Sequence, residues 1–98
     1  MVEYLADCVR ALAEQDIIIN AVITDEEENQ VTENCRLVLH EKDREKMILS
    51  VEGRYLPENL IWEFVIPASA TKGLRGRYWY CVQWAGNAMC FKQPMYLI

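Results

Sequence analysis

The side chains best suited to chemistry in this sequence are four cysteines and one histidine. They are Cys8, Cys35, Cys81, Cys90 and His40. A structural zinc site takes thiolate and imidazole ligands at short, paired spacings, and the sequence contains no Cys-x-x-Cys pair. We therefore expect no metal site and no cofactor. The thiols are expected to stay reduced and to act as small apolar side chains.

A disulfide between two of these cysteines is an open alternative. A tight turn at residues 85–87 is expected to connect the last two strands, and the centre of that turn sets their register. A turn centred on residues 85 and 86 places Cys81 opposite Cys90, whereas a turn centred one residue later does not.

No grouping of side chains indicates an enzyme. His40 precedes Glu41, but no serine or cysteine stands in the sequence context of a nucleophile elbow. The acidic run at residues 25–28 lacks the alternating oxygen ligands and the glycine of a calcium loop. There is also no glycine-rich phosphate loop. We expect no catalytic residues.

Charge and hydropathy narrow the choice of partners. The formal net charge is −5 and the pI is about 4.8. Nucleic-acid binding needs clustered basic residues, and the densest grouping here is only Lys72, Arg75 and Arg77, so we expect no nucleic-acid partner. No apolar run reaches the roughly 20 residues that span a bilayer. The first ten residues also do not have the pattern of a signal peptide, so synthesis in the cytoplasm without membrane association is expected.

Aromatic side chains are concentrated in residues 77–84, which have the composition of a strand. Side chains alternate between the two faces of a strand. One face would carry Tyr78, Tyr80, Val82 and Trp84, and the other Trp79, Cys81 and Gln83. Both faces cannot fill one small core, so some rings are expected to be exposed or to contact a partner subunit. The alternative is that Trp79 packs beneath a neighbouring loop.

The last four residues form a second candidate contact. Residues 95–98 are apolar and carry no charge that would discourage strand pairing. Such a segment either pairs centrally within its own sheet or docks against a neighbouring subunit. The candidate partner-contact residues are Trp79, Trp84, Tyr96 and Leu97.

The elements that would position these residues are mostly strands. Runs typical of strands cover residues 17–24, 36–40, 47–51, 60–66, 77–84 and 89–98. The run at 60–66 alternates, with Trp62, Phe64 and Ile66 on one face. Small residues at 68–74 predict a short helical crossover, and apolar residues at helical spacing predict an N-terminal helix over residues 2–13. We expect one domain over residues 1–98, folded as an antiparallel β-sandwich.

Two short motifs are familiar. A strand ends in the turn Pro67–Thr71 (PASAT), and the next strand begins with Gly76–Tyr80 (GRYWY). Upstream, Glu14–Asp16 (EQD) and an acidic turn at residues 25–31 complete the pattern, although the acidic turn lacks the usual glycine and proline. These features resemble small Ig-like sandwich domains in the virions of tailed bacteriophages and prophages. The spacing of the strand-like runs predicts about seven strands. The resemblance to Ig-like domains agrees with that number and implies a strand rather than a helix over residues 8–13.

The same resemblance implies a function. Such domains are structural modules of tail, baseplate or fibre-associated proteins and bring no catalytic residues. We therefore expect a non-enzymatic virion protein, made in the bacterial cytoplasm, that contacts other virion subunits as a homo- or hetero-oligomer. The alternative is a small cytosolic prophage protein that binds and modulates a host protein.

Overall fold

The fold is built from strands that form a single sheet. The computed structural model describes residues 2–4, 8–24, 27–41, 46–84 and 93–98. The strands, in chain order, are β1 (Val2–Tyr4), β2 (Val9–Ala11), β3 (Ile17–Ala21), β4 (Cys35–His40), β5 (Met47–Leu56), β6 (Ile61–Ile66), β7 (Gly76–Trp84) and β8 (Gln93–Leu97). Their order in the sheet is β1-β2-β8-β7-β4-β5-β6-β3. All described pairings are antiparallel except the one between β2 and β8. The predicted all-β class is confirmed.

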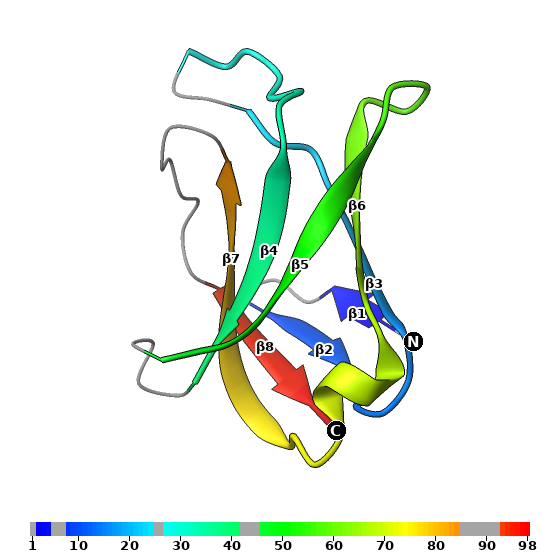
Figure 1. Ribbon diagram of the computed structural model, residues 1–98, viewed down its shortest axis with the longest axis vertical. Coiled ribbons are helices and arrows are strands. Elements are labelled where there is room, and N and C mark those ends of the chain that lie inside the picture. Colours follow the sequence, from blue (N-terminus) through cyan, green and yellow to red (C-terminus); the bar gives the residue numbers. More distant parts are fainter. Residues whose placement is uncertain (1, 5–7, 25–26, 42–45, 85–92) are drawn as a thin grey trace.

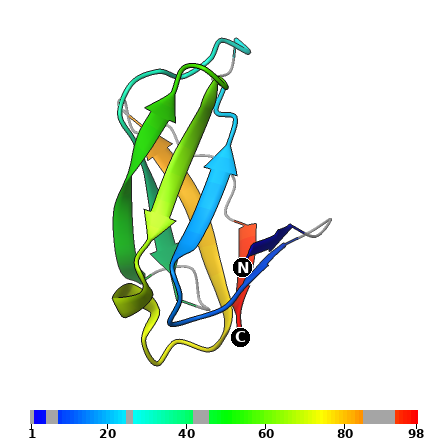
Figure 2. The same ribbon diagram turned by 90° about the vertical axis from the view of Figure 1, so that its right-hand side faces the viewer.

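One long strand, β5, folds the sheet over on itself. Its first part pairs with β4 as far as Glu52, and its second part, from Gly53 onward, pairs with β6. In Figure 1, β5 runs diagonally from the side of β4 to the side of β6. The half containing β6 and β3 therefore faces the half containing β4 and β7, and the sheet approaches a barrel (Figure 2).

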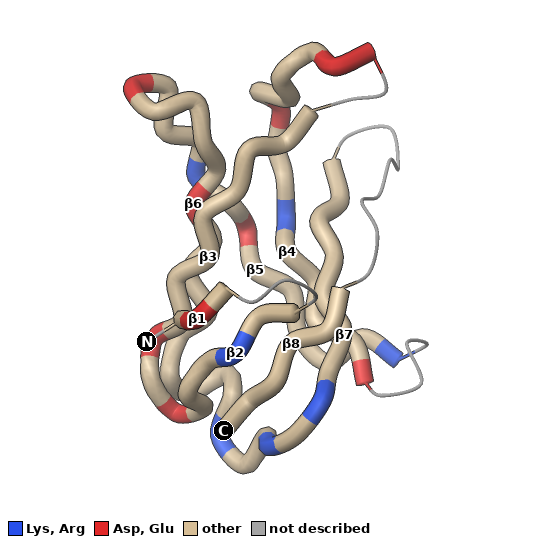
Figure 3. The backbone as a smooth tube through the Cα atoms, turned by 180° about the vertical axis from the view of Figure 1, so that it is seen from behind, with Lys and Arg blue, Asp and Glu red and all other residues tan. Residues whose placement is uncertain are grey.

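The two edges of the sheet, β1 and β3, come together without a shared ladder. The backbone N–H of Asn20 in β3 donates a hydrogen bond to the hydroxyl of Tyr4 in β1, at 3.2 Å. Figure 3 shows β1 beside β3 when the molecule is seen from behind. A side chain thus spans the gap that backbone bonds would close in a complete barrel.

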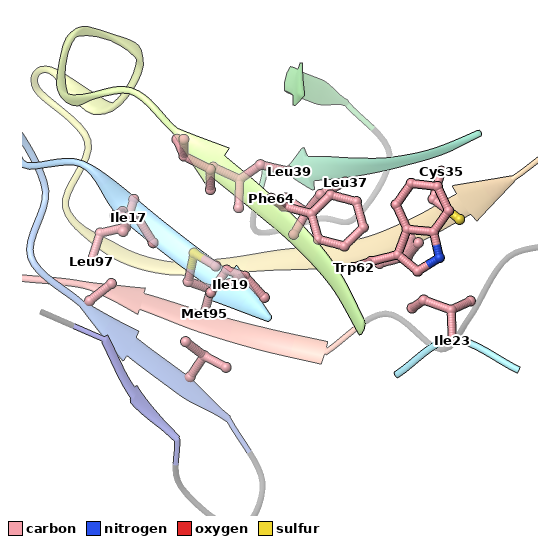
Figure 4. Packing of buried hydrophobic residues seen from close by; sticks show 14 of the residues in the cluster. Ile17, Ile19, Ile23, Cys35, Leu37, Leu39, Trp62, Phe64, Met95 and Leu97 are labelled. Atoms are coloured by element: carbon pink, nitrogen blue, oxygen red, sulfur yellow. The ribbon is translucent and has the colours of Figure 1, made fainter. Parts of the chain in front are cut away.

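The core lies between the two halves. Trp62, Phe64 and Ile66 are buried, which confirms the predicted alternation of β6. Figure 4 shows Met95 and Leu97 of β8 in the same cluster as residues of β3, β4 and β6. The indole N–H of Trp62 donates to the carbonyl of Val31 at 2.7 Å, so its one polar group is satisfied despite burial.

The predicted N-terminal helix is wrong. Residues 2–4 and 9–11 form β1 and β2, and the second of these lies within the strand that the resemblance implies at 8–13. Val9 and Ala11 are buried, and β2 pairs in parallel with β8. Pairing with a strand more than 80 residues away outweighs the local helical spacing.

The predicted crossover at residues 68–74 is shorter than expected. It contains one 3-10 helix, Ala68–Thr71, and the described residues contain no α-helix. None of their helices is long and apolar enough to cross a membrane. The turn predicted at residues 85–87 lies outside the described residues.

A buried threonine holds the 3-10 helix against the turn that precedes β3. Glu14, in this turn, has a φ of 63° and donates its backbone N–H to Oγ1 of Thr71 at 2.8 Å. Asp16 accepts a hydrogen bond from the backbone N–H of Ala68 at 2.9 Å, and Arg75 Nη2 lies 2.6 Å from Glu14 Oε2. These bonds tie together segments more than 50 residues apart.

Thr71→Val should lower the free energy of unfolding by about 1–3 kcal/mol. Valine has a similar volume, but its side chain cannot accept a hydrogen bond from the backbone N–H of Glu14. Because Thr71 is fully buried, this N–H would lose its partner. Urea denaturation measures the change. Thr71→Ser is the control, since it keeps the hydroxyl, and equal midpoints for wild type and Thr71→Val would contradict the account.

Gly53 stands where β5 changes partner, directly beneath two core rings. A Cβ atom at this position would lie 2.5 Å from Cε1 of Phe64 and 2.9 Å from Cε3 of Trp62. The rings of Trp62 and Phe64 are themselves stacked, with centroids 6.4 Å apart. Because the core is close-packed, the two rings have little space to move away from an added Cβ atom.

Gly53→Ala should therefore destabilise the protein by about 1–3 kcal/mol, the usual cost of overpacking. Thermal or urea unfolding measures the loss. Ser50→Ala, on the exposed face of the same strand, is the matched control and should be close to neutral. A Gly53→Ala variant as stable as Ser50→Ala would show that the rings move aside freely.

Candidate protein-contact surface

The aromatic strand β7 presents its two faces to different surroundings. Val82 belongs to the core cluster. Tyr78, Tyr80 and Trp84 are partly buried and pack against this cluster. Trp79 is on the opposite, outward face and is not part of the core cluster. The division of β7 side chains predicted from alternation is confirmed.

Trp79 is an outward-facing ring that is nevertheless mostly covered. Only 8% of its surface is exposed. The guanidinium carbon of Arg77 lies 4.5 Å from the ring centroid, which is cation–π geometry. Across the ladders, Trp79 pairs with Pro94 of β8 and with His40 of β4.

Tyr96 extends the same face toward β2. It is 36% exposed and pairs with Arg77 on one side and with Arg10 on the other. Figure 3 shows the two basic positions on β2 and β7 flanking β8. Arg10 is held by an ion pair with Glu3 at 2.9 Å. We call Arg10, Arg77, Trp79 and Tyr96 the aromatic–basic surface.

Two of the four predicted contact residues are not on this surface. Leu97 is 1% exposed and belongs to the core, so it is withdrawn as a contact residue. Trp84 is half-buried against the core and points away from Trp79. The sheet places β8 between β2 and β7, so residues 95–97 pair centrally and do not form an edge.

The sequence interpretation missed the two arginines. Arg77 and Trp79 are two residues apart on one strand, which places them on the same face. This spacing in the sequence was the available signal that the two side chains lie next to each other. The position of Arg10 beside Tyr96 had no sequence signal, because it depends on the parallel pairing of β2 with β8.

Beside Trp79 lies a buried contact between a thiol and an imidazole. Cys81 Sγ is 3.7 Å from His40 Nε2, and both residues are buried on the outward face of the sheet. Within the part of the chain that the structure describes, no three His, Cys, Asp or Glu side chains are arranged to hold a metal ion. The alternative Cys81–Cys90 disulfide involves Cys90, which lies outside the described residues.

The thiol of Cys35 is in a different setting, inside the core. Burial, and secondarily the carboxylate of Glu33, raises its pKa from 9.0 to about 11. Its Sγ lies 3.5 Å from the backbone carbonyl of Glu33, a contact in which the protonated thiol donates. Both features favour the neutral form.

Between pH 9.0 and about 11, the stability of the protein should fall partly because of Cys35. In this window the unfolded thiol releases its proton while the folded thiol keeps it, so rising pH favours unfolding. Urea titrations of wild type and Cys35→Ala across the window measure the two slopes. Wild type should lose more stability with pH than the variant, and parallel slopes would contradict the raised pKa.

Among known proteins, no family model, no curated protein and no solved structure matches this chain. The resemblance of its short motifs to phage sandwich domains therefore stays a prediction.

Proposed function

We propose that this protein is a non-enzymatic structural component of a tailed phage or prophage particle. In this proposal it assembles into the tail or baseplate region through contacts with other virion subunits. The observation that carries the proposal is the aromatic–basic surface, in which Arg77 stacks on Trp79 beside the half-exposed ring of Tyr96.

The composition of that surface suits a protein partner. Tryptophan, tyrosine and arginine are the residues most enriched at the energetic centres of protein interfaces. Trp79 and Tyr96 lie on adjacent strands of a continuous sheet, so their positions are fixed before binding. A pre-ordered surface loses less entropy when it binds.

The charge of Arg77 suggests what the partner presents. Among the described residues no carboxylate lies within ion-pair distance of Arg77, whereas Arg10 is paired with Glu3. Its guanidinium is exposed and can bind a carboxylate in two parallel hydrogen bonds. The proposed partner therefore offers an acidic side chain beside an apolar patch that covers Tyr96.

The finer fold assignment belongs to the same proposal. We infer an Ig-like arrangement, in which β3, β6 and the second part of β5 form one layer and β4, β7 and β8 lie in the other. The chain changes layer between β3 and β4, within β5, and again between β6 and β7. Such crossings between two antiparallel layers are typical of Greek-key sandwiches.

Arg77→Ala should reduce incorporation of the protein into particles, with a loss of affinity of about tenfold for an interface centre worth 1–2 kcal/mol. Arg54→Ala is the matched control, an exposed arginine on β5 outside the aromatic–basic surface. The measurement is co-sedimentation of each variant with purified virions. Thermal unfolding should show both variants folded, with Arg77→Ala losing no more than the roughly 0.5–1 kcal/mol of an exposed cation–π contact.

Equal incorporation of Arg77→Ala and Arg54→Ala would remove the aromatic–basic surface from the contact. Absence of the wild-type protein from purified particles would overturn the structural role and favour the alternative, a protein that binds a host target. Trp79→Ala is a poor probe, because removing a ring with 8% exposure also destabilises the fold.

A further inference from the structure

The edge strand β3 directs one set of backbone groups away from the sheet. In an antiparallel strand, the N–H and C=O of alternate residues point to the same side. Asn20 directs its N–H away from β6, toward Tyr4, while Ile23 directs its carbonyl to the other side, where it accepts the N–H of Val31 at 2.9 Å. Ile18 therefore shares the outer side with Asn20, and continuing the alternation one residue beyond the end of β3 at Ala21 places Val22 there as well. Neither Ile18 nor Val22 has a backbone partner on that side among the described residues.

Exposed apolar side chains surround this edge. Val22 is 62% exposed, and Ile18 and Val65, which are directly paired, are 45% and 41% exposed. Residues 17–24 (IIINAVIT) contain no charged residue and no proline. Natural sheet edges usually carry such residues to prevent pairing with other chains, and here they are missing.

We propose that β3 pairs antiparallel with β3 of a second copy of this chain, forming one sheet across a symmetric dimer. A two-fold axis at Asn20 places Ile18 of each copy opposite Val22 of the other, and the two Asn20 residues opposite each other. Each contact is then apolar against apolar or amide against amide. The segment is its own complement, which is what a two-fold interface requires.

The electrostatics of this arrangement permit self-association despite a net charge of −5 on each copy. The nearest acidic neighbour on the ladder is Glu63, opposite Asn20 on β6 and 3.8 Å from Arg54. In the dimer the two Glu63 positions are separated by three strand spacings, about 14 Å. That exceeds the Debye length of about 8 Å at physiological ionic strength, so the repulsion between them is already screened. Added salt further screens the general repulsion between two copies that each carry a net charge of −5, and should therefore favour the dimer.

Tyr4 competes with the second copy. Its hydroxyl accepts the Asn20 N–H that the partner strand would bind, and β1 itself lies beside β3, so dimer formation must displace β1 as well as replace this hydrogen bond. Removing the hydroxyl while keeping the ring should therefore promote association. This inference uses a different surface from the aromatic–basic surface and does not depend on the proposed function.

Sedimentation equilibrium of the full chain over a range of protein and salt concentrations tests the proposal. Wild type should dimerise reversibly and more tightly at high salt, Val22→Lys should raise the dissociation constant at least tenfold, and Tyr4→Phe should lower it. Leu60→Lys is the matched control, an apolar residue with 52% exposure in the β5–β6 turn, and should behave as wild type. Circular dichroism confirms that each variant is folded.

Three outcomes would overturn the proposal. The first is a wild type that stays monomeric at all concentrations, and the second is equal weakening by Val22→Lys and Leu60→Lys. The third is a dimer that Val22→Lys leaves intact and Arg77→Ala disrupts, which would assign self-association to the aromatic–basic surface instead. Failure of virion incorporation with an intact β3 dimer would count only against the proposed function.

Discussion

The fold depends on one strand, β5, serving both halves of the sheet, and this requires a residue without a side chain at the point of transfer. Gly53 is the first residue of β5 that pairs with β6, and the rings of Phe64 and Trp62 occupy the space that a Cβ would take. Because these rings are in the centre of the core, the two halves of the sheet can pack closely only if residue 53 has no side chain. The hydrogen bond from Trp62 to Val31 then fixes the ring that rests on the glycine.

The folding of the sheet on itself also gives the two faces of β7 different surroundings. Its inward side chains meet residues from the opposite half, and Tyr78, Tyr80 and Trp84 pack against the core. Its outward side chains lie on the other face of the sheet, where the guanidinium of Arg77 stacks on the ring of Trp79. A strand with rings on both faces is thus compatible with a small domain, because only the inward set has to fit into the core.

Local patterns in the sequence predicted what local physics controls. The alternation of β6 and the two faces of β7 follow from the spacing of side chains along a strand. The helical crossover predicted at residues 68–74 was correct only for the short 3-10 helix Ala68–Thr71. The N-terminal strands did not follow, because Val9 and Ala11 are placed by pairing with β8, and spacing alone favoured a helix. Leu97 was misjudged for the same reason: a short apolar segment looks alike at an edge and in the middle of a sheet, and only its neighbours distinguish the two. The place of Arg10 in the aromatic–basic surface also depends on the pairing of β2 with β8.

The parallel pairing of β2 with β8 has a consequence for synthesis on the ribosome. Val9, Ala11, Met95 and Leu97 all belong to one core, and the backbone of Ile98 bonds with both Ala11 and Ala13. Residues 9–11 therefore cannot form their strand pairing, and their apolar side chains stay exposed, until residues 93–98 have left the exit tunnel. Because contacts so distant in sequence form slowly, these side chains are exposed to unwanted association until then. The uncharged segment at residues 17–24, which contains β3, emerges during that interval, so co-translational binding by a chaperone would matter more for this chain than for a helical protein of equal length.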